Sequence, residues 1–293
     1  MNDADTREPL VSIVTPCLNM GRFVEETLLS VLEQNYPRIE YLVMDGGSSD
    51  GTLEILRRYE GRLRWISQPD RGQADAVNRG FEQTSGAVFA FLNADDTYLP
   101  GAVAAAVEAL AEHPEAAVAY GNAWHVAKDG GRLAPYPVEP FEPANLSRRC
   151  FICQPAAFVR REVFAASGML DAGLRFAFDY DLWIRIARRH PMVRVDRDLA
   201  TSRIHAQAKT MAETGAAMRE TIGVLKRHYG YVPYNWLYGY GHQRLTHRPL
   251  AIETPKPALS SACFSMALGA RYNWRHPLRY CRDIVDTARK GLA

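Results

Sequence analysis

An α/β fold with a mostly parallel central sheet is the fold class that this sequence predicts. Short apolar runs, typical of buried strands, alternate with segments of helical periodicity between residues 10 and 210. Polar and acidic side chains follow several of these runs, and ligands bind beyond the carboxyl ends of strands in parallel sheets. The 293 residues, 47% of them hydrophobic, suit one large domain or a domain with an appendage.

The first elements follow from the pattern of apolar side chains. Residues 11–16 form a β-branched run that ends in a proline, which indicates a strand. Residues 23–32 carry apolar side chains at helical spacing, and the apolar run at 41–44 indicates a second strand. A glycine-rich turn is expected at 45–52, followed by a helix at 53–59 and a strand at 63–66.

The same alternation continues through the middle of the chain. A helix at 74–82 precedes an apolar run at 87–92, which indicates a strand buried on both faces. Further helices are expected at 101–112, 162–167 and 178–187, with a strand at 117–120 and a mixed segment at 154–159. The proline-rich segment 135–143 is expected to be either a surface loop or a loop that moves over a site.

Two adjacent carboxylates, Asp95 and Asp96, directly follow the buried run at 87–92. Charged groups at the end of a buried strand are costly unless something neutralises them. A divalent cation would do so, since Mg²⁺ typically takes one or two protein carboxylates together with phosphate oxygens. The alternative is that the pair only begins a turn or caps the next helix.

Several other function classes lack their motifs. The turn at 45–52 does not have the G-x-G-x-x-G spacing, and neither a P-loop nor a G-x-S-x-G elbow occurs in the chain. Five scattered cysteines predict free thiols in a reducing cytoplasm, and Cys150 and Cys153 lack the second pair of a zinc site. No signal peptide or transmembrane helix is evident, which predicts a cytoplasmic protein.

A set of motifs in a fixed order gives the chain a family resemblance. The motifs are VSIVTP with Asn19, VMDGGSSDGT (43–52), DRGQADAVNRG (70–80), LNADD (92–96), DYDLWIR (179–185) and RIH (203–205). Together they resemble family 2 of the inverting glycosyltransferases over about residues 10–210. The resemblance implies a GT-A fold, in which a nucleotide-sandwich domain is followed by an acceptor-side half.

The resemblance also implies roles on the donor side. Thr15 and Asp45 would hold the nucleobase, and Asn19 and Arg71 would belong to the same nucleotide site. Asp95 would approach the ribose and the metal. Asp96 is the preferred direct ligand of Mn²⁺ or Mg²⁺, although the sequence does not separate the two carboxylates. His205 would contact the metal or the diphosphate; its alternative is a histidine on a surface loop.

On the acceptor side, Asp179 matches the catalytic base of the family. Inverting transfer needs a carboxylate that takes the proton of the acceptor hydroxyl. Asp181 is the rival two residues later, and the two point in different directions from a first helical turn. Residues that would line the donor or acceptor sugar are Gln73, Asp75, Asn78, Gln154 and Asp181.

Three positions depart from the family pattern. The first Asp of the usual D-x-D motif is Asn93, the second Asp of the usual D-D-G turn is Gly46, and the Glu that usually precedes the base is Phe178. These departures leave open a rival hypothesis, namely a catalytically degenerate protein that binds a nucleotide sugar or acts as a scaffold. The preferred hypothesis is a metal-dependent inverting transferase that moves a sugar from a nucleotide-diphosphate sugar to a hydroxyl in surface polysaccharide or glycolipid synthesis.

Composition sets the expected domain limits. Residues 1–9 are expected to be disordered, and residues 10–225 to form the transferase domain, with a donor half at 10–120 and an acceptor half at 121–225. Residues 226–293 carry eleven lysines and arginines against three acids, together with nine tyrosines and tryptophans. This extension would either pack as helices on the catalytic domain or dock at an anionic membrane that carries a lipid-linked acceptor. Nucleic acid is not an expected partner.

Overall fold

The computed structural model describes residues 8–205, 208–246 and 259–289. The chain forms two compact units, which are described separately. The first contains residues up to Phe141 and then Phe151–Ile204, and the second contains Glu142–Cys150 and His205 onward. The expected disorder of residues 1–9 falls largely outside the described residues.

A mixed sheet forms the centre of the first unit. Its strands are β1 (Val11–Cys17), β2 (Ile39–Asp45), β3 (Arg64–Ser67), β4 (Val88–Phe91), β5 (Thr97–Tyr98), β6 (Val118–Val126), β7 (Arg132–Pro135), β8 (Ala157–Arg160) and β9 (Met192–Arg203). Within the described residues their order is β3-β2-β1-β4-β8-β6-β9-β5, with β7 paired to β6. The half from β3 to β4 is parallel, β9 runs parallel to β6, and β8 is antiparallel to both of its neighbours.

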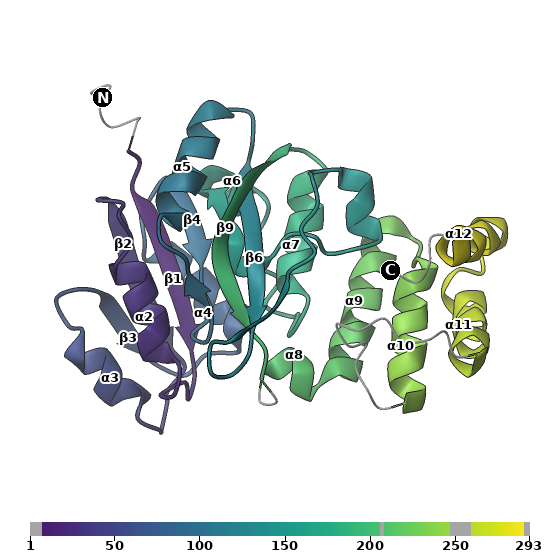
Figure 1. The fold of residues 1–293 in the computed structure, drawn as a ribbon, viewed down its shortest axis with the longest axis horizontal. Coiled ribbons are helices and arrows are strands. Elements are labelled where there is room, and N and C mark those ends of the chain that lie inside the picture. Colours follow the sequence, from purple (N-terminus) through teal and green to yellow (C-terminus); the bar gives the residue numbers. More distant parts are fainter. Residues whose placement is uncertain (1–7, 206–207, 247–258, 290–293) are drawn as a thin grey trace. The chain divides into compact units, whose positions relative to one another are not determined.

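Helices cover the sheet of the first unit and bury its apolar side chains. They are α2 (Val24–Leu32), α3 (Thr52–Arg58), α4 (Gln73–Glu82), α5 (Ala102–Glu112), α6 (Arg161–Ala166) and α7 (Phe178–Ala187), with a 3-10 turn at Gln154–Ala156. A further 3-10 turn, at Pro143–Ser147, belongs to the second unit. In Figure 1, α2 lies in front of β1 and β2. Every residue of β1 and β4 is buried, and for β4 this is what its uninterrupted apolar run predicts.

The parallel strands place their carboxyl ends at one edge of the sheet. Cys17, the last residue of β1, is the register partner of Asp45, the last residue of β2. Asp45 is in turn the register partner of Ser67, which ends β3. On the other side of β1, β4 ends at Phe91 and leads into the Asp95–Asp96 pair. The polar side chains that follow these strands therefore meet at a single edge.

The second unit is a group of helices. These are α8 (Lys209–Ala212), α9 (Thr214–Tyr229), α10 (Tyr234–Thr246), α11 (Leu259–Tyr272) and α12 (Pro277–Arg289), and residues 142–150 pack with them. The boundary between the units falls after Ile204, whereas the change in charge predicts one near residue 225. The two differ because α9 begins before the basic segment and packs with α10. No described helix is long and apolar enough to cross a membrane.

Candidate active site

Asp45 organises the turn that follows β2. The side chain is 1% exposed, and its Oδ2 accepts hydrogen bonds from the main-chain N–H groups of Gly47 and Ser48, both at 3.0 Å. The hydroxyl of Ser67 donates to the same oxygen at 2.6 Å, and the hydroxyl of Ser48 donates to Oδ1. This carboxylate therefore holds the start of the glycine-rich turn, a role that the sequence pattern did not predict.

Thr15 in β1 and Asn19, which follows β1, have different surroundings. Thr15 is fully buried, and its hydroxyl shares a 3.0 Å hydrogen bond with Tyr41 in the core. Its predicted contact with a nucleobase stays a prediction, because the structure gives this side chain no exposed surface. Asn19 is exposed, and its Oδ1 accepts from the N–H of Ser49 at 2.9 Å. Its own N–H donates to the Ser48 hydroxyl at 2.7 Å, which joins the β1 loop to the β2 turn.

Gly46 has a local steric explanation. A Cβ atom placed there would lie 2.7 Å from the Oδ2 atom of Asp70. Asp70 thus comes close to the position where a side chain of residue 46 would begin, and its Oδ1 accepts the N–H of Gly72 at 2.8 Å. The glycine leaves room for the Asp70 side chain in this position, and a larger residue would require that side chain to shift.

The two adjacent carboxylates after β4 have different surroundings. Asp96 is 3% exposed; its Oδ1 accepts the N–H of Arg203 at 2.8 Å and its Oδ2 accepts the side-chain N–H of Asn93 at 3.0 Å. Asp95 is partly exposed. Burial, and next the nearby charge of Asp95, raise the pKa of Asp96 well above its ordinary value. The preference for Asp96 as the direct metal ligand stays a prediction; in the structure Asp95 is the more accessible of the two carboxylates.

Arg203 is a site residue to which sequence analysis gave no role. Its guanidinium is nearly fully buried and donates to the carbonyl of Asp95 at 2.9 Å and to the Glu26 carboxylate at 2.6 Å. It also donates to the carbonyls of Ala127 and Lys128, at 3.2 and 3.1 Å. This arginine ties the end of β9 to the Asp95–Asp96 loop and the β6–β7 hairpin. Its position in the RIH motif was the one feature of the sequence that could have indicated a role for this arginine.

The two candidate bases of α7 are separated by burial. Asp181 is 2% exposed and pairs with Arg185 at 2.7 Å; Arg185 also donates to the carbonyls of Met169, at 2.7 Å, and Ser167. Asp179, in contrast, is partly exposed at the first turn of the helix, where its Oδ1 accepts the N–H of Tyr180 at 2.8 Å. Asp179 is thus the more accessible carboxylate, and Asp181 holds the loop before the helix.

Phe91, the last residue of β4, brings the acceptor-side elements to the carboxylate pair. Its ring lies 6.3 Å from that of Phe178, centroid to centroid, so the start of α7 packs against the end of β4. Its carbonyl accepts the side-chain N–H of Gln154 at 2.5 Å. Gln154 is buried, so in this structure it acts as a brace between the 3-10 turn at 154–156 and β4.

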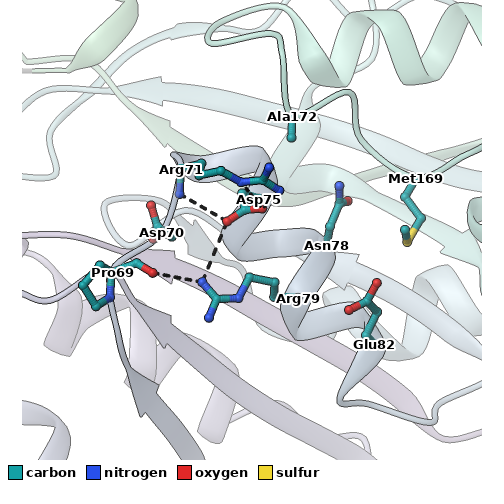
Figure 2. A pocket seen from close by; sticks show the side chains of 9 residues that line it. All are labelled: Pro69, Asp70, Arg71, Asp75, Asn78, Arg79, Glu82, Met169 and Ala172. Atoms are coloured by element: carbon teal, nitrogen blue, oxygen red, sulfur yellow. Dashed lines mark hydrogen bonds and ion pairs between the residues drawn. The ribbon is translucent and has the colours of Figure 1, made fainter.

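A pocket of about 620 Å³ lies beside α4, and Figure 2 shows its lining. Arg71 and Arg79 flank Asp75, with N···O distances of 2.6 and 3.8 Å. The hydrogen bond from Arg71 holds the pKa of the buried Asp75 carboxyl below its ordinary value. Asn78 bonds both the N–H and the carbonyl of Leu170, at 3.0 and 2.8 Å, and so orders the loop before α7.

Gln73 and His205 complete the predicted set. Gln73, the first residue of α4, donates to the side-chain oxygen of Asn93, and Asn93 in turn donates to Asp96. This chain joins α4 to the carboxylate pair. His205 is buried and belongs to the second unit, so its predicted contact with metal or diphosphate stays a prediction.

The residues after β4 fit a divalent cation that also takes ligands from a bound molecule. Among the described residues, no group of three or more His, Cys, Asp and Glu side chains could hold a metal ion on its own. Two carboxyl groups lie together here, Asp96 buried and Asp95 accessible, and a bound cation would favour the ionised form of both. Mg²⁺ commonly binds through one or two carboxylates and completes its shell with phosphate oxygens and water.

Sequence comparison finds related proteins over the first unit. A family described as "Glycosyl transferase family 2" matches residues 12–166. An uncharacterized glycosyltransferase of Rickettsia felis is 29% identical over 68% of this chain and 35% of that protein. A PGL/p-HBAD biosynthesis glycosyltransferase of Mycobacterium bovis is 32% identical over 60% of this chain and 69% of that protein. The chain spans 30 to 66% of the length of five rickettsial relatives that it matches.

Solved structures show the same fold. TarS of S. aureus (residues 1–349), in complex with UDP-GlcNAc, gives a TM-score of 0.62 at 15% identity, covering 90% of this chain and 80% of that one. The mannosyltransferase PcManGT of Pyrobaculum calidifontis, in complex with GDP-Man and Mn²⁺, gives 0.56 at 17% identity, covering 97% of this chain and 76% of that one. At these identities the likeness establishes the fold alone, and it confirms the predicted GT-A class.

Proposed function

The chain belongs to glycosyl transferase family 2, and from this premise we propose that it transfers a sugar from a nucleotide-diphosphate sugar to a hydroxyl acceptor with inversion at the anomeric carbon. Surface polysaccharide or glycolipid synthesis is the proposed process, in keeping with relatives named for O-antigen, teichuronic acid and PGL/p-HBAD biosynthesis.

One observation carries the proposal. The contact between Phe91 and Phe178 places the start of α7, with its accessible carboxylate Asp179, beside the strand that leads to Asp95 and Asp96. An inverting transferase needs both groups within reach of one sugar, because the diphosphate leaves on one side of the anomeric carbon while the hydroxyl attacks from the other. Phe178 is therefore a packing residue that joins the two halves of the proposed site, and its presence is no sign of decay.

On the donor side, the turns after β1 and β2 would hold the nucleoside and the carboxylates after β4 its diphosphate. The turn that Asp45 fixes is rigid before any ligand arrives, which lowers the entropic cost of binding. Arg71 offers an exposed guanidinium in the loop before α4, and its partner Asp75 limits where that charge can point. A diphosphate is a suitable ligand for such a charge.

A divalent cation, Mn²⁺ or Mg²⁺, is the proposed cofactor, and when bound it would neutralise the charge of the leaving diphosphate. Asp95 is the proposed direct ligand of the cation, because its carboxylate is the accessible one of the pair. Asp96 would support it from behind, held by Asn93 and Arg203. Asn93 thus has a defined function as a neutral donor at a position where a third carboxylate would add repulsion.

Asp179 is the proposed catalytic base. Its carboxylate would take the proton of the acceptor hydroxyl as that oxygen forms the new bond to the anomeric carbon and the bond to the diphosphate breaks. Asp181 is committed to Arg185 and is not available for this step. Its predicted contact with a sugar stays a prediction, and the Asp181 side chain has almost no exposed surface in this structure.

The test is the release of nucleoside diphosphate from a panel of UDP-, GDP-, dTDP- and CDP-sugars with Mn²⁺. The wild-type chain is expected to hydrolyse one donor class slowly without an acceptor and to transfer from it when a suitable hydroxyl is present. Asp179→Asn is expected to lower turnover by about 10²- to 10⁴-fold, the usual contribution of a general base. Binding of the donor should be retained, since Asp179 lies on the acceptor side.

The matched control is Asp196→Asn, because Asp196 is a carboxylate with an 88% exposed side chain at a distance from the site. This variant should keep wild-type turnover. Wild-type protein that binds a donor but neither hydrolyses nor transfers it under any condition would favour the rival hypothesis of a binding or scaffold protein. Equal activity of the wild type and Asp179→Asn would remove Asp179 from its proposed role.

A further inference from the structure

Most aromatic side chains of the basic C-terminal segment belong to a core and do not form a surface. Tyr231, Tyr234, Tyr238 and Tyr240 are all buried within the second unit, as is Tyr280 from α12. The aromatic richness that suggested a binding surface over the whole of 226–293 is therefore mainly used for packing. Among the aromatic side chains of this segment that the structure describes, Trp274, in the turn before α12, is exposed, and Tyr229, Trp236 and Tyr272 are half-buried.

Helix α12 has its apolar and polar faces reversed relative to an ordinary surface helix. Its buried residues are Tyr280, Asp283 and Thr287, which follow one another at helical spacing. The opposite side of the helix, which we call the α12 outer face, consists of Leu278, Cys281, Arg282, Val285 and Arg289. Leu278 is 85% exposed and Val285 is 47% exposed. A helix of a globular protein normally turns such side chains toward its core.

Buried hydrogen bonds fix this orientation. The carboxylate of Asp283 accepts from Arg148 at 2.8 Å, from the Tyr231 hydroxyl at 3.1 Å and from the Tyr234 N–H at 2.7 Å. The Tyr280 hydroxyl donates to the carbonyl of Ser265 in α11 at 2.8 Å. Rotating α12 to bury Leu278 would break these bonds and leave a buried carboxylate without donors, which is costly. The outer face therefore remains apolar because the inner face is committed.

The turn before α12 carries a further exposed apolar side chain. Trp274 is 65% exposed, and the guanidinium of Arg275 lies 4.8 Å from the centre of its ring. Arg282 and Arg289 lie on the outer face with Leu278 and Val285, and Arg275 is exposed in the preceding turn. Of the acids of α12, Asp283 is buried, and Asp286 follows Arg282 by four residues, so it offsets only part of the positive charge of these three arginines.

We propose that the α12 outer face, with Trp274 and Arg275, docks on an anionic phospholipid surface. Helices that lie in a membrane interface combine apolar side chains with flanking Lys and Arg, and tryptophan is enriched at the depth of the headgroups. A second copy of the chain is a poorer occupant, since a face-to-face pairing would oppose the arginines of one copy to those of the other. The proposal is independent of the catalytic site and of the proposed sugar transfer.

The test is flotation of the full chain with vesicles of phosphatidylcholine alone and with vesicles of equal parts phosphatidylcholine and phosphatidylglycerol. The chain is expected to float only with the anionic vesicles and to be released at high salt. Arg275→Gln with Arg282→Gln should weaken the partition by about 25-fold, at roughly fivefold per arginine near an anionic surface. Leu278→Ser with Val285→Ser should weaken it by at least about tenfold through lost apolar burial.

Matched controls separate docking from general charge or stickiness. Arg57→Gln with Arg62→Gln removes two exposed arginines from the first unit, and Leu133→Ser removes a 52% exposed leucine from β7. These variants should float as the wild type does. All the substituted positions are exposed, so the melting temperatures should stay unchanged, and a variant that does not keep its melting temperature is replaced by Leu278→Gln alone.

Flotation equal in the α12 variants and the wild type, or no flotation of the wild type with anionic vesicles, would overturn the proposal. Sedimentation of the protein without lipid distinguishes membrane docking from pairing with a second copy of the chain. A dimer that is lost in the Leu278→Ser and Val285→Ser variant, with no flotation of the wild type, would assign the face to a second copy of the chain.

Discussion

Asp179 and Asp181 lie two residues apart, and the helix geometry gives them different tasks. Asp181 points inward to Arg185, while Asp179 remains accessible at the beginning of α7. A buried ion pair whose arginine also donates to main-chain carbonyls mainly holds local structure, whereas an accessible carboxylate in a family motif is suited to chemistry. Substitution of Asp181 should therefore lower the stability of the protein, whereas substitution of Asp179 should lower its activity.

Asp181→Asn is expected to destabilise the protein by about 2 kcal/mol, because it removes the charge that offsets the buried part of Arg185. Asp179→Asn is expected to change the unfolding free energy by less than about 0.5 kcal/mol, as for other accessible positions. Urea unfolding followed by circular dichroism measures both. Equal midpoints for the two variants would contradict this division of roles.

At the residue scale, the sequence could single out candidate carboxylates but not the surroundings of each one. The adjacent acids after a buried strand predicted a charged site, yet nothing in the order Asp95–Asp96 tells which side chain turns inward. That choice depends on Arg203, which lies over a hundred positions later in the chain and donates its N–H to Asp96. Thr15 shows the same limit, because its core partner Tyr41 comes from the neighbouring strand.

At the scale of elements, Arg203 at the end of β9 holds three segments together. Its guanidinium satisfies carbonyls from the Asp95–Asp96 loop and from the β6–β7 hairpin and pairs with Glu26 of α2. A lysine has the same charge, but its single ammonium group cannot donate to all of these acceptors at once, as the planar guanidinium does.

Arg203→Lys is therefore expected to cost about 2–3 kcal/mol of unfolding free energy, because buried carbonyls lose their donors. It should also weaken Mn²⁺-dependent nucleotide binding, since the main chain at Asp95 would lose its support. Chemical denaturation and a nucleotide titration would measure the two effects. A lysine variant with wild-type stability and affinity would show that Arg203 does not position the loop.

The β6–β7 hairpin carries a pH-sensitive residue. Burial lowers the pKa of His125 below its usual 6.5, and a hydrogen bond that involves the main chain of Ser202 opposes the shift in part. Since the unfolded chain takes up the proton at the higher pH, the stability contributed by neutral His125 is complete above pH 6.5 and is lost as the pH falls below it.

The difference in unfolding free energy between the wild type and His125→Phe should therefore decrease below that pH, with a slope of at most about 1.4 kcal/mol per pH unit. Thermal or urea unfolding across pH 5 to 8 measures it, at roughly the range in which histidine titrates. A difference independent of pH would mean that His125 is protonated equally in both states. The phenylalanine retains the ring that packs 5.3 Å from Tyr136.

Element by element, the parallel half of the sheet was predictable and the other half was not. β4 is an uninterrupted apolar run buried on both faces, and β1 and β2 are rich in β-branched and apolar residues, which is why these strands appear clearly in the sequence. β9 is twelve residues long but alternates apolar with charged side chains, and β7 has two exposed apolar or charged positions beside its proline. Both depend on pairing with β6, which is information that local patterns do not contain.

At the scale of the whole molecule, composition and packing divide the chain differently. The basic segment begins near residue 226, but the helical unit begins at His205 and also takes in residues 142–150. Tyr231, Tyr234 and Asp283 bind one another across that unit, so long-range contacts and not local charge determine where it starts. The domain limits drawn from charge remain a prediction about function, while the two compact units describe how the chain packs.

The central claim is that the edge of the sheet beyond β1, β2 and β4 binds a nucleoside diphosphate together with a divalent cation. Thermal shift with UDP, GDP, dTDP and CDP, each with and without Mn²⁺, tests this claim most directly. A ligand at a hundred times its dissociation constant adds about 2.7 kcal/mol of stability, which corresponds to several degrees for a domain of this size.

The account predicts a shift with one nucleotide that requires Mn²⁺, disappears in Asp95→Ala and persists in the Asp196→Ala control. Absence of a shift with every nucleotide would contradict the claim, and so would a metal-dependent shift that survives in Asp95→Ala.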